Sequence, residues 1–230
     1  MNEIFLSSAT IGVVISIAAY EIGVFLKKKT KLAICNPMLI SILLIIGFLL
    51  ACGIEYESYL HSAQYLNYLL TPTTVCLAIP LYQKLNLLKE NFAAILISIL
   101  AGVCSSGLSI LAMSILFGLS HEQYVTLLPK SITTAIGMGM SEELGGIVTI
   151  TVASIVITGI TGNMLGAQLC DLFRIKHPIS KGLALGTSTH AIGTARAMEL
   201  GEVEGAMSSL AMVVAGLCTV IAASIFAMFW

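Results

Sequence analysis

Long apolar runs separated by short polar segments dominate the hydrophobic pattern of the chain. A helix needs about 20 apolar residues to cross the hydrocarbon core of a bilayer. Five runs have about this length, and we expect each to form a membrane-spanning helix: residues 4–26, 36–54, 92–119, 147–172 and 206–230. The pattern therefore predicts an all-α polytopic membrane protein.

Three further runs are apolar but carry prolines, glycines, hydroxyl side chains or charges that disturb a helix. They cover residues 66–82, 124–146 and 182–199. Proline removes a backbone donor, and backbone groups freed inside a membrane must find partners in the protein or in a water-filled cavity. We expect these broken segments to carry the function.

Composition supports the membrane class. The chain is 57% hydrophobic and only 10% charged, whereas soluble domains carry about 25% charged residues. Its mean hydropathy is +0.99. The net charge of −1 gives no electrostatic reason to bind nucleic acid. The first residues lack the basic region of a cleaved signal, so we expect the first helix to be retained.

The positions of the basic residues predict the orientation. Nine of the eleven lysines and arginines lie in the loops 27–31, 84–89 and 174–181, which the positive-inside rule places in the cytoplasm. Two clear spans and the segment 124–146 separate the second loop from the third, so this segment must enter and leave on one side. We therefore predict about seven crossings plus one re-entrant hairpin.

The order of the segments suggests an internal repeat within one membrane domain, residues 1–230. The blocks 36–119 and 147–230 each run span, broken segment, span, and they begin on opposite sides of the membrane. The interruptions expected at 71–74 and 186–189 occupy matching places. Broken helices in two inverted halves are a sequence indication of a transporter's central site.

Lys130 is one of two basic side chains inside the broken segments. An ionisable residue within a membrane normally faces a polar cavity or a partner. Ser131, Thr133 and Thr134 follow it, so one cation and several hydroxyl donors form a candidate cradle for a carboxylate. The alternative is that the ammonium extends to the membrane interface.

The segment 182–199 is richer still in polar side chains. Its candidate binding residues are Thr187, Ser188, Thr189, His190, Thr194 and Arg196. His190 can carry a coupled proton near neutral pH, or it can be a hydrogen-bonded core histidine. Arg196 can hold a carboxylate, or it can pair with Glu199 three residues later. In the first interruption, Thr71, Thr73 and Thr74 flank Pro72 and offer hydroxyls to a solute.

Other features favour structural roles. Six cysteines lie singly in apolar runs without metal-ligand spacing, and we expect neither a metal nor a cofactor. The spacings Gly162-x-x-x-Gly166 and Gly182-x-x-x-Gly186 favour close helix packing. The chain has no HExxH, Walker or GxSxG motif, so we do not expect an enzyme.

The broken segments also resemble the LrgB/CidB family over essentially the whole chain. The matching pieces are NP at 36–37, TPTTVCLAIPLY at 71–82, PKSITT at 129–134 and GLALGTSTHAIGTARA at 182–197. Thr71, Cys76 and Gly137 depart from residues that are common in the family.

That resemblance implies a protein of the bacterial cytoplasmic (inner) membrane with one of two activities. Some members were named antiholin-like modulators of murein hydrolase activity and cell lysis, paired with a small LrgA/CidA-like membrane protein. Related proteins look like transporters of monocarboxylates such as pyruvate, glycolate or glycerate. We expect a transporter of a small organic anion, in contact with lipid and with such a partner, and a homo-oligomer is compatible with this. The alternative is a regulatory subunit of a holin-like pore.

Overall fold

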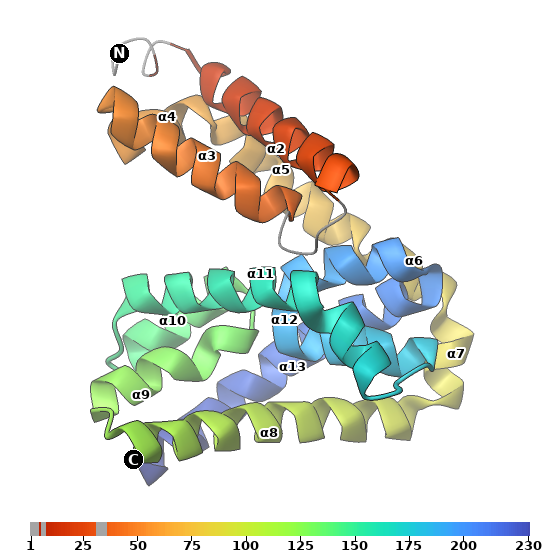
Figure 1. Cartoon of the computed structure of the whole chain (residues 1–230). Helices are drawn as coiled ribbons and strands as arrows, with labels where there is room; N and C mark the ends of the chain where they lie inside the picture. The colour runs from red at the N-terminus through yellow and green to blue at the C-terminus, as the bar shows by residue number, and fades with distance from the viewer. Residues whose placement is uncertain (1–4, 6–7, 31–35) are drawn as a thin grey trace. The chain divides into compact units, whose positions relative to one another are not determined.

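The computed structural model describes residues 5, 8–30 and 36–230, and every regular element within them is helical (Figure 1). Contacts divide the chain into two compact units, Met1–Cys76 and Leu77–Trp230, and each is described by itself. The predicted all-α class is confirmed for this part of the chain. Residues 4, 6 and 7 of the span predicted at 4–26, Lys31 of the predicted loop 27–31 and one of the six cysteines, Cys35, lie outside the described residues.

The first unit is a group of packed helices. Its elements are α2 (Ile11–Thr30), α3 (Pro37–Cys52), α4 (Tyr56–Ser62) and α5 (Gln64–Cys76). Asn36 begins α3: its side-chain Oδ1 accepts a hydrogen bond from the Met38 amide at 2.9 Å, and Pro37 occupies the first turn. Ser16 of α2 and Tyr59 of α4 are joined through their hydroxyls at 2.8 Å. These bonds fix the ends and the mutual packing of the first helices.

The prediction that the helix is interrupted at 71–74 is wrong. Pro72 lies inside α5, and the helix continues through it to Cys76. The next helix, α6 (Ala78–Gln83), begins only two residues later. A proline removes one backbone donor, but a helix can continue past it when the neighbouring turns remain bonded. The irregularity of the segment 66–82 therefore falls at Leu77.

The second unit contains the long apolar helices. After α6 its elements are α7 (Leu85–Glu90), α8 (Phe92–Phe117), α9 (His121–Leu127), η1 (Leu128–Ser131), α10 (Thr134–Glu143), α11 (Val148–Leu172), α12 (Pro178–Leu200), α13 (Glu202–Phe226) and η2 (Ala227–Phe229). Within the described residues, three helices are long and apolar enough to cross a membrane: α8, α11 and α13 with η2. They coincide with the spans predicted at 92–119, 147–172 and 206–230. The total number of crossings stays a prediction.

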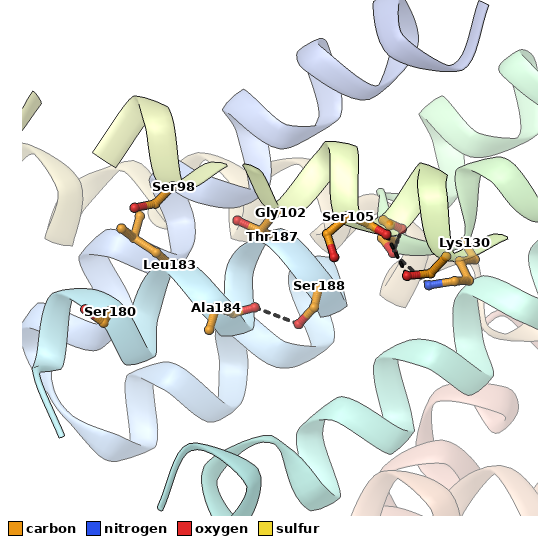
Figure 2. A pocket seen from close by; sticks show the side chains of 12 residues that line it. Ser98, Gly102, Ser105, Lys130, Ser180, Leu183, Ala184, Thr187 and Ser188 are labelled. Carbon is orange, nitrogen blue, oxygen red and sulfur yellow. Dashed lines mark hydrogen bonds between the residues drawn. The ribbon is translucent and has the colours of Figure 1, made fainter. Parts of the chain in front are cut away.

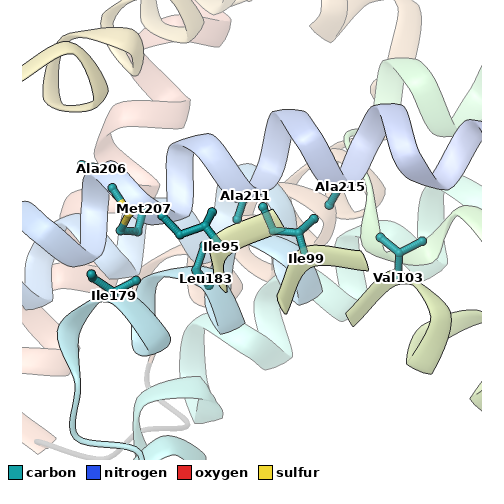
Figure 3. Close-up of a cluster of buried hydrophobic side chains, with 9 residues drawn as sticks. All are labelled: Ile95, Ile99, Val103, Ile179, Leu183, Ala206, Met207, Ala211 and Ala215. Carbon is teal, nitrogen blue, oxygen red and sulfur yellow. The ribbon is translucent and has the colours of Figure 1, made fainter. Parts of the chain in front are cut away.

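One apolar cluster holds α8, α12 and α13 together (Figure 3). Its members are Ile95, Ile99 and Val103 of α8, Ile179 and Leu183 of α12, and Ala206, Met207, Ala211 and Ala215 of α13. The small α13 side chains let α12 approach closely. A Cβ added at Gly186 would lie 2.2 Å from the Ser208 carbonyl oxygen, so the packing interpretation of Gly182-x-x-x-Gly186 is confirmed.

The other glycine spacing packs α11 on α12. A Cβ at Gly162 would lie 1.9 Å from Cγ2 of Thr189, and one at Gly166 would lie 2.4 Å from Cδ2 of Leu185. Both positions therefore need glycine for the helices to touch. The packing interpretation holds for this pair as well.

The segment 124–146 forms two short helices, α9 and α10, joined by η1. Buried hydroxyls close the base of this helical hairpin. The Thr126 hydroxyl accepts a hydrogen bond from the Ile147 amide at 2.8 Å. Thr151 of α11 contacts both arms: its Oγ1 lies 2.8 Å from the Thr126 carbonyl and 2.7 Å from the Ser141 hydroxyl. The depth of the hairpin in a bilayer stays a prediction.

Candidate functional site

Helix α12 is broken in its middle, as the sequence predicts for 182–199. Thr189 has φ −136° and His190 has φ 42° and ψ −140°, so the helical path is lost at these two residues. The break lies at the end of the expected 186–189 interruption. Positive φ is costly for a residue with a side chain, by about 1–3 kcal/mol, so the surroundings must hold His190 in place.

Hydrogen bonds from α11 and from α12 itself stabilise the break. His190 is 3% exposed, and its Nε2 lies 3.1 Å from the Ile155 carbonyl oxygen. Thr194 donates to the His190 carbonyl at 2.9 Å. Asn163 of α11 donates to the Ile192 carbonyl, also at 2.9 Å. Of the two alternatives for His190, the structure shows the hydrogen-bonded core histidine.

A cavity of about 460 Å³ lies between α8 and α12, with η1 at one end (Figure 2). Eight of its twelve lining residues carry hydroxyl groups, and none carries a carboxylate. The lining consists of Ser98, Gly102, Ser105, Ser106, Ser109, Lys130, Ser131, Ser180, Leu183, Ala184, Thr187 and Ser188. The only charge in this lining is the ammonium of Lys130.

Helix α8 contributes a polar stripe that the sequence analysis missed. Ser98, Gly102, Ser105, Ser106 and Ser109 follow one another at intervals that keep them on one face of a helix. The hydrophobic pattern predicts only an unbroken span here, but these serines recur at the helical period, which is the signal in the sequence that indicates this face.

Helix α12 supplies the facing wall. Ser180, Ala184, Thr187 and Ser188 line the cavity at the same helical period. The two walls are in close contact at Gly102, where an added Cβ would lie 2.7 Å from Cγ2 of Thr187. Both residues line the cavity.

Lys130 is positioned by its buried neighbours. Pro129 is fully buried, Leu128 is 4% exposed and Ile132 is 1% exposed, so η1 is anchored on both sides of the lysine. The lysine itself is half-buried, and its Nζ lies 3.3 Å from Oγ of Ser131. The described part of the chain holds no ion pair of Lys130.

The hydroxyl of Ser131 links the lysine to α8. Its Oγ lies 3.2 Å from Oγ of Ser106. Lys130, Ser131 and Ser106 therefore form a continuous polar chain across the cavity wall. An ammonium with no carboxylate nearby is an electrostatically suitable site for an anion.

Two smaller spaces adjoin this cavity. One of about 150 Å³ shares Ser98, Ser180 and Leu183 with it and reaches Asn91 and His177 at the first residues of α8 and α12. The other holds only about 10 Å³ and shares Ser106, Ser131 and Thr187.

The smaller of these two spaces, about 10 Å³, ends at the aromatic ring of Phe226. Phe226 fills the notch at Gly107, where an added Cβ would lie 2.5 Å from its Cε2 atom. Tyr124 donates to the Phe226 carbonyl at 2.9 Å. Phe226 therefore closes this small space, whereas the cavity continues past Ser98 into the larger of the two adjoining spaces.

The structure brings four predicted site residues together: Lys130, Ser131, Thr187 and Ser188 all line the cavity. Thr133 precedes α10 as its N-terminal cap position and Thr134 begins that helix, and neither belongs to the lining.

Other predicted residues have structural contacts. Thr189 is buried and donates to the Leu185 carbonyl at 2.7 Å. Thr194 lies 2.9 Å from the Ser208 hydroxyl of α13. Arg196 forms an ion pair with Glu199, as the structural alternative predicts.

The three candidate threonines of the first unit, Thr71, Thr73 and Thr74, lie within α5. Thr73 is exposed there. Their role in binding stays a prediction.

Comparisons with known proteins identify relatives over nearly the whole chain. A model of the LrgB-like family matches residues 16–229. The chain is 39% identical to "Holin-like protein CidB" of Staphylococcus epidermidis over 213 residues, 93% of this chain and 92% of that protein. It is 39% identical to "Antiholin-like protein LrgB" of Bacillus subtilis over 216 residues, 94% of each chain. No solved structure matches the chain significantly.

Proposed function

The chain belongs to the LrgB-like family, and from this premise we propose that it transports a small monocarboxylate such as pyruvate, glycolate or glycerate across the bacterial cytoplasmic membrane. The substrate binds in the cavity between α8 and α12. The observation that carries the proposal is the single ammonium of Lys130 in a hydroxyl-rich lining without a carboxylate. A lining of this kind suits one negative charge together with neighbouring polar oxygens.

Each group has a distinct task in this proposal. Lys130 neutralises the carboxylate, while Ser131 and Ser106 fix the position of the ammonium beside the anion. Thr187 and Ser188 complete the opposite wall from α12. His190, Thr189 and Thr194 position that wall by maintaining the break in the helix.

Transport requires the end of the cavity near Phe226 to open. Phe226 closes the small adjoining space at Gly107, and past Ser98 the cavity continues toward Asn91 and His177. Movement of α12 around its break relative to α8 exposes the cavity alternately to the two sides. Broken helices that move against a partner helix are a common device of secondary transporters.

Uptake into proteoliposomes tests the proposal. Purified protein should give saturable uptake of labelled pyruvate or glycolate, and Lys130→Gln should raise KM by roughly 10- to 100-fold, as expected for loss of a hydrogen bond to a charged group. Lys28→Gln is the matched control because Lys28 is exposed and lies on α2, none of whose residues line the cavity or the spaces beside it. Absence of saturable uptake by the wild-type chain would overturn the proposal.

The second candidate function is regulation of a holin-like pore that controls murein hydrolase activity and lysis. The names of the relatives favour it, because they are called holin-like and antiholin-like proteins. In this case the partner is a small LrgA/CidA-like membrane protein. Reconstitution with and without that partner separates the two candidates. A regulator should change the leakage of large dyes through the partner's pore, and it should transport no acid when it is reconstituted alone.

A further inference from the structure

The cavity is larger than a three-carbon acid requires. Pyruvate has six non-hydrogen atoms, and even at about 30 Å³ for each, the volume of a water molecule in the liquid, it would fill less than half of the 460 Å³. A ligand pocket normally encloses most of its ligand. Six of the twelve lining residues are exposed, so the pocket is open on one side, and the position of this remainder rather than its volume indicates the ligand. This inference rests on the proposed function.

The remainder lies along one direction, away from Lys130. Ser106, which connects to Lys130 through Ser131, lies near one end of the cavity, and Ser98 lies near the other. The eight residue steps from Ser98 to Ser106 correspond to about 12 Å along α8. Figure 2 shows Lys130 at one end and Ser98 and Ser180 at the opposite end. A three-carbon acid held by Lys130 does not reach this second end.

The hydroxyls of the two walls differ in what they offer a ligand. Three serines donate their proton to a carbonyl of their own helix, at 2.7, 2.6 and 2.6 Å: Ser98 to Ala94, Ser109 to Ser105, and Ser188 to Ala184. A hydroxyl that already donates presents only acceptor lone pairs to the cavity. Carboxylate oxygens are also acceptors, so these serines do not suit the charged end of a ligand. They suit a ligand group that donates, such as an alcohol.

The lysine end has the opposite preference. The Lys130 ammonium carries three donor hydrogens and no acceptor. Among the described residues, its Nζ is within hydrogen-bond distance of the Ser131 hydroxyl, so donor hydrogens remain for a ligand. The cavity therefore offers one ammonium to a carboxylate and acceptor hydroxyls to alcohol groups. Ser109 and Ser188 lie toward the Lys130 end, and Ser98 lies at the other end (Figure 2).

We propose that the preferred ligand of this cavity is an unbranched hydroxylated monocarboxylate of about five or six carbons, that is, an acid of the aldonic class. Its carboxylate lies at Lys130, and its alcohol groups donate to the serines along α8 and α12. Ser98 and Ser180 are the residues that distinguish this ligand from a three-carbon acid.

Competition measurements test the ligand class directly. In proteoliposomes that take up labelled pyruvate, D-gluconate should inhibit at concentrations at least about tenfold lower than unlabelled pyruvate, the gain expected from one or two additional hydrogen bonds. Hexanoate is the matched control, because it has the same chain length and charge but no alcohol groups. It should inhibit more weakly than gluconate.

A pair of variants locates the second end of the ligand. Ser98→Ala combined with Ser180→Ala should raise the inhibition constant of gluconate by about tenfold and the KM of pyruvate by a much smaller factor. Lys130→Gln should weaken both acids together. Ser224→Ala serves as the control, because Ser224 is exposed on α13 and bonds only within its own helix. Size-exclusion profiles in detergent verify that each variant is folded.

The outcomes separate this inference from the proposed function. Saturable pyruvate uptake with no inhibition by gluconate, or with equal inhibition by hexanoate, overturns the inference and leaves the transporter proposal standing. An equal effect of the double serine variant on both acids also overturns it. Absence of uptake of either acid removes the transporter proposal itself.

Discussion

Gly102 of α8 and Thr187 of α12 face each other across the cavity, because a Cβ on Gly102 would lie 2.7 Å from Cγ2 of Thr187. That distance is shorter than a normal van der Waals contact, so a side chain at position 102 requires Thr187 or one of the helices to move. The contact lies between the Lys130 end and the Ser98 end (Figure 2), and we expect it to set the width available to a ligand.

Gly102→Ala should therefore impair transport without unfolding the protein. The added methyl either pushes Thr187 into the cavity or separates α8 from α12, and we expect Vmax to fall several-fold. Thr187→Ser removes the methyl group that clashes, so the double variant Gly102→Ala with Thr187→Ser should recover most of the uptake. Equal impairment of the single and double variants would show that the contact does not control the width.

His190 should respond differently to alanine and to glycine. Both substitutions remove the hydrogen bond to the Ile155 carbonyl, which costs about 1 kcal/mol. Only glycine relieves the positive φ of 42°, a strain of about 1–3 kcal/mol. His190→Gly should therefore melt at a higher temperature than His190→Ala, as measured by thermal unfolding in detergent. The reverse order would mean that the backbone at 190 is not strained.

Thr151 should be important for the helical hairpin of residues 124–146. Its hydroxyl is fully buried and lies within hydrogen-bond distance of the Thr126 carbonyl and the Ser141 hydroxyl. Thr151→Val keeps the shape but removes these bonds, and we expect a loss of about 1–3 kcal/mol of stability. Thr151→Ser retains the hydroxyl and should lose less. Limited proteolysis within 144–147 provides a second measurement of hairpin opening.

The re-entrant topology has its own test. If the hairpin enters and leaves on the outer side, cysteines introduced at Glu122 and at Glu142 should both react with an impermeant maleimide added outside. The experiment needs a background in which the six native cysteines are replaced by alanine. Reaction at only one of the two positions would show that the segment crosses the membrane, and the predicted orientation of the flanking loops would then be wrong.

The apolar helices were predictable because hydrophobic length alone specifies them. The runs at 92–119, 147–172 and 206–230 became α8, α11 and α13 with small shifts at their ends. The break in 182–199 was also visible in its polar residues, although its position at Thr189 and His190 was not. The break expected around Pro72 did not form, because one missing donor is insufficient to end a helix whose next turns are intact.

The site was predictable where its residues are neighbours in the sequence. Lys130 and Ser131 are adjacent, and the pairing of Arg196 with Glu199 follows from helical spacing. The helical period also places the lining serines of α8 on one face of that helix. It does not identify the helix that packs opposite this face.

The sequence by itself determined that this is a helical membrane protein, that its longest apolar runs are helical, and that a lone lysine lies among hydroxyl groups. Only the tertiary structure decided that Ser106 meets Ser131 and that Gly102 meets Thr187. The physical reason is that composition and helical period define the polar face of a single helix. Which helix that face packs against depends on where small residues allow two helices to approach. The close approach at Gly102 brings the polar stripes of α8 and α12 together in one cavity.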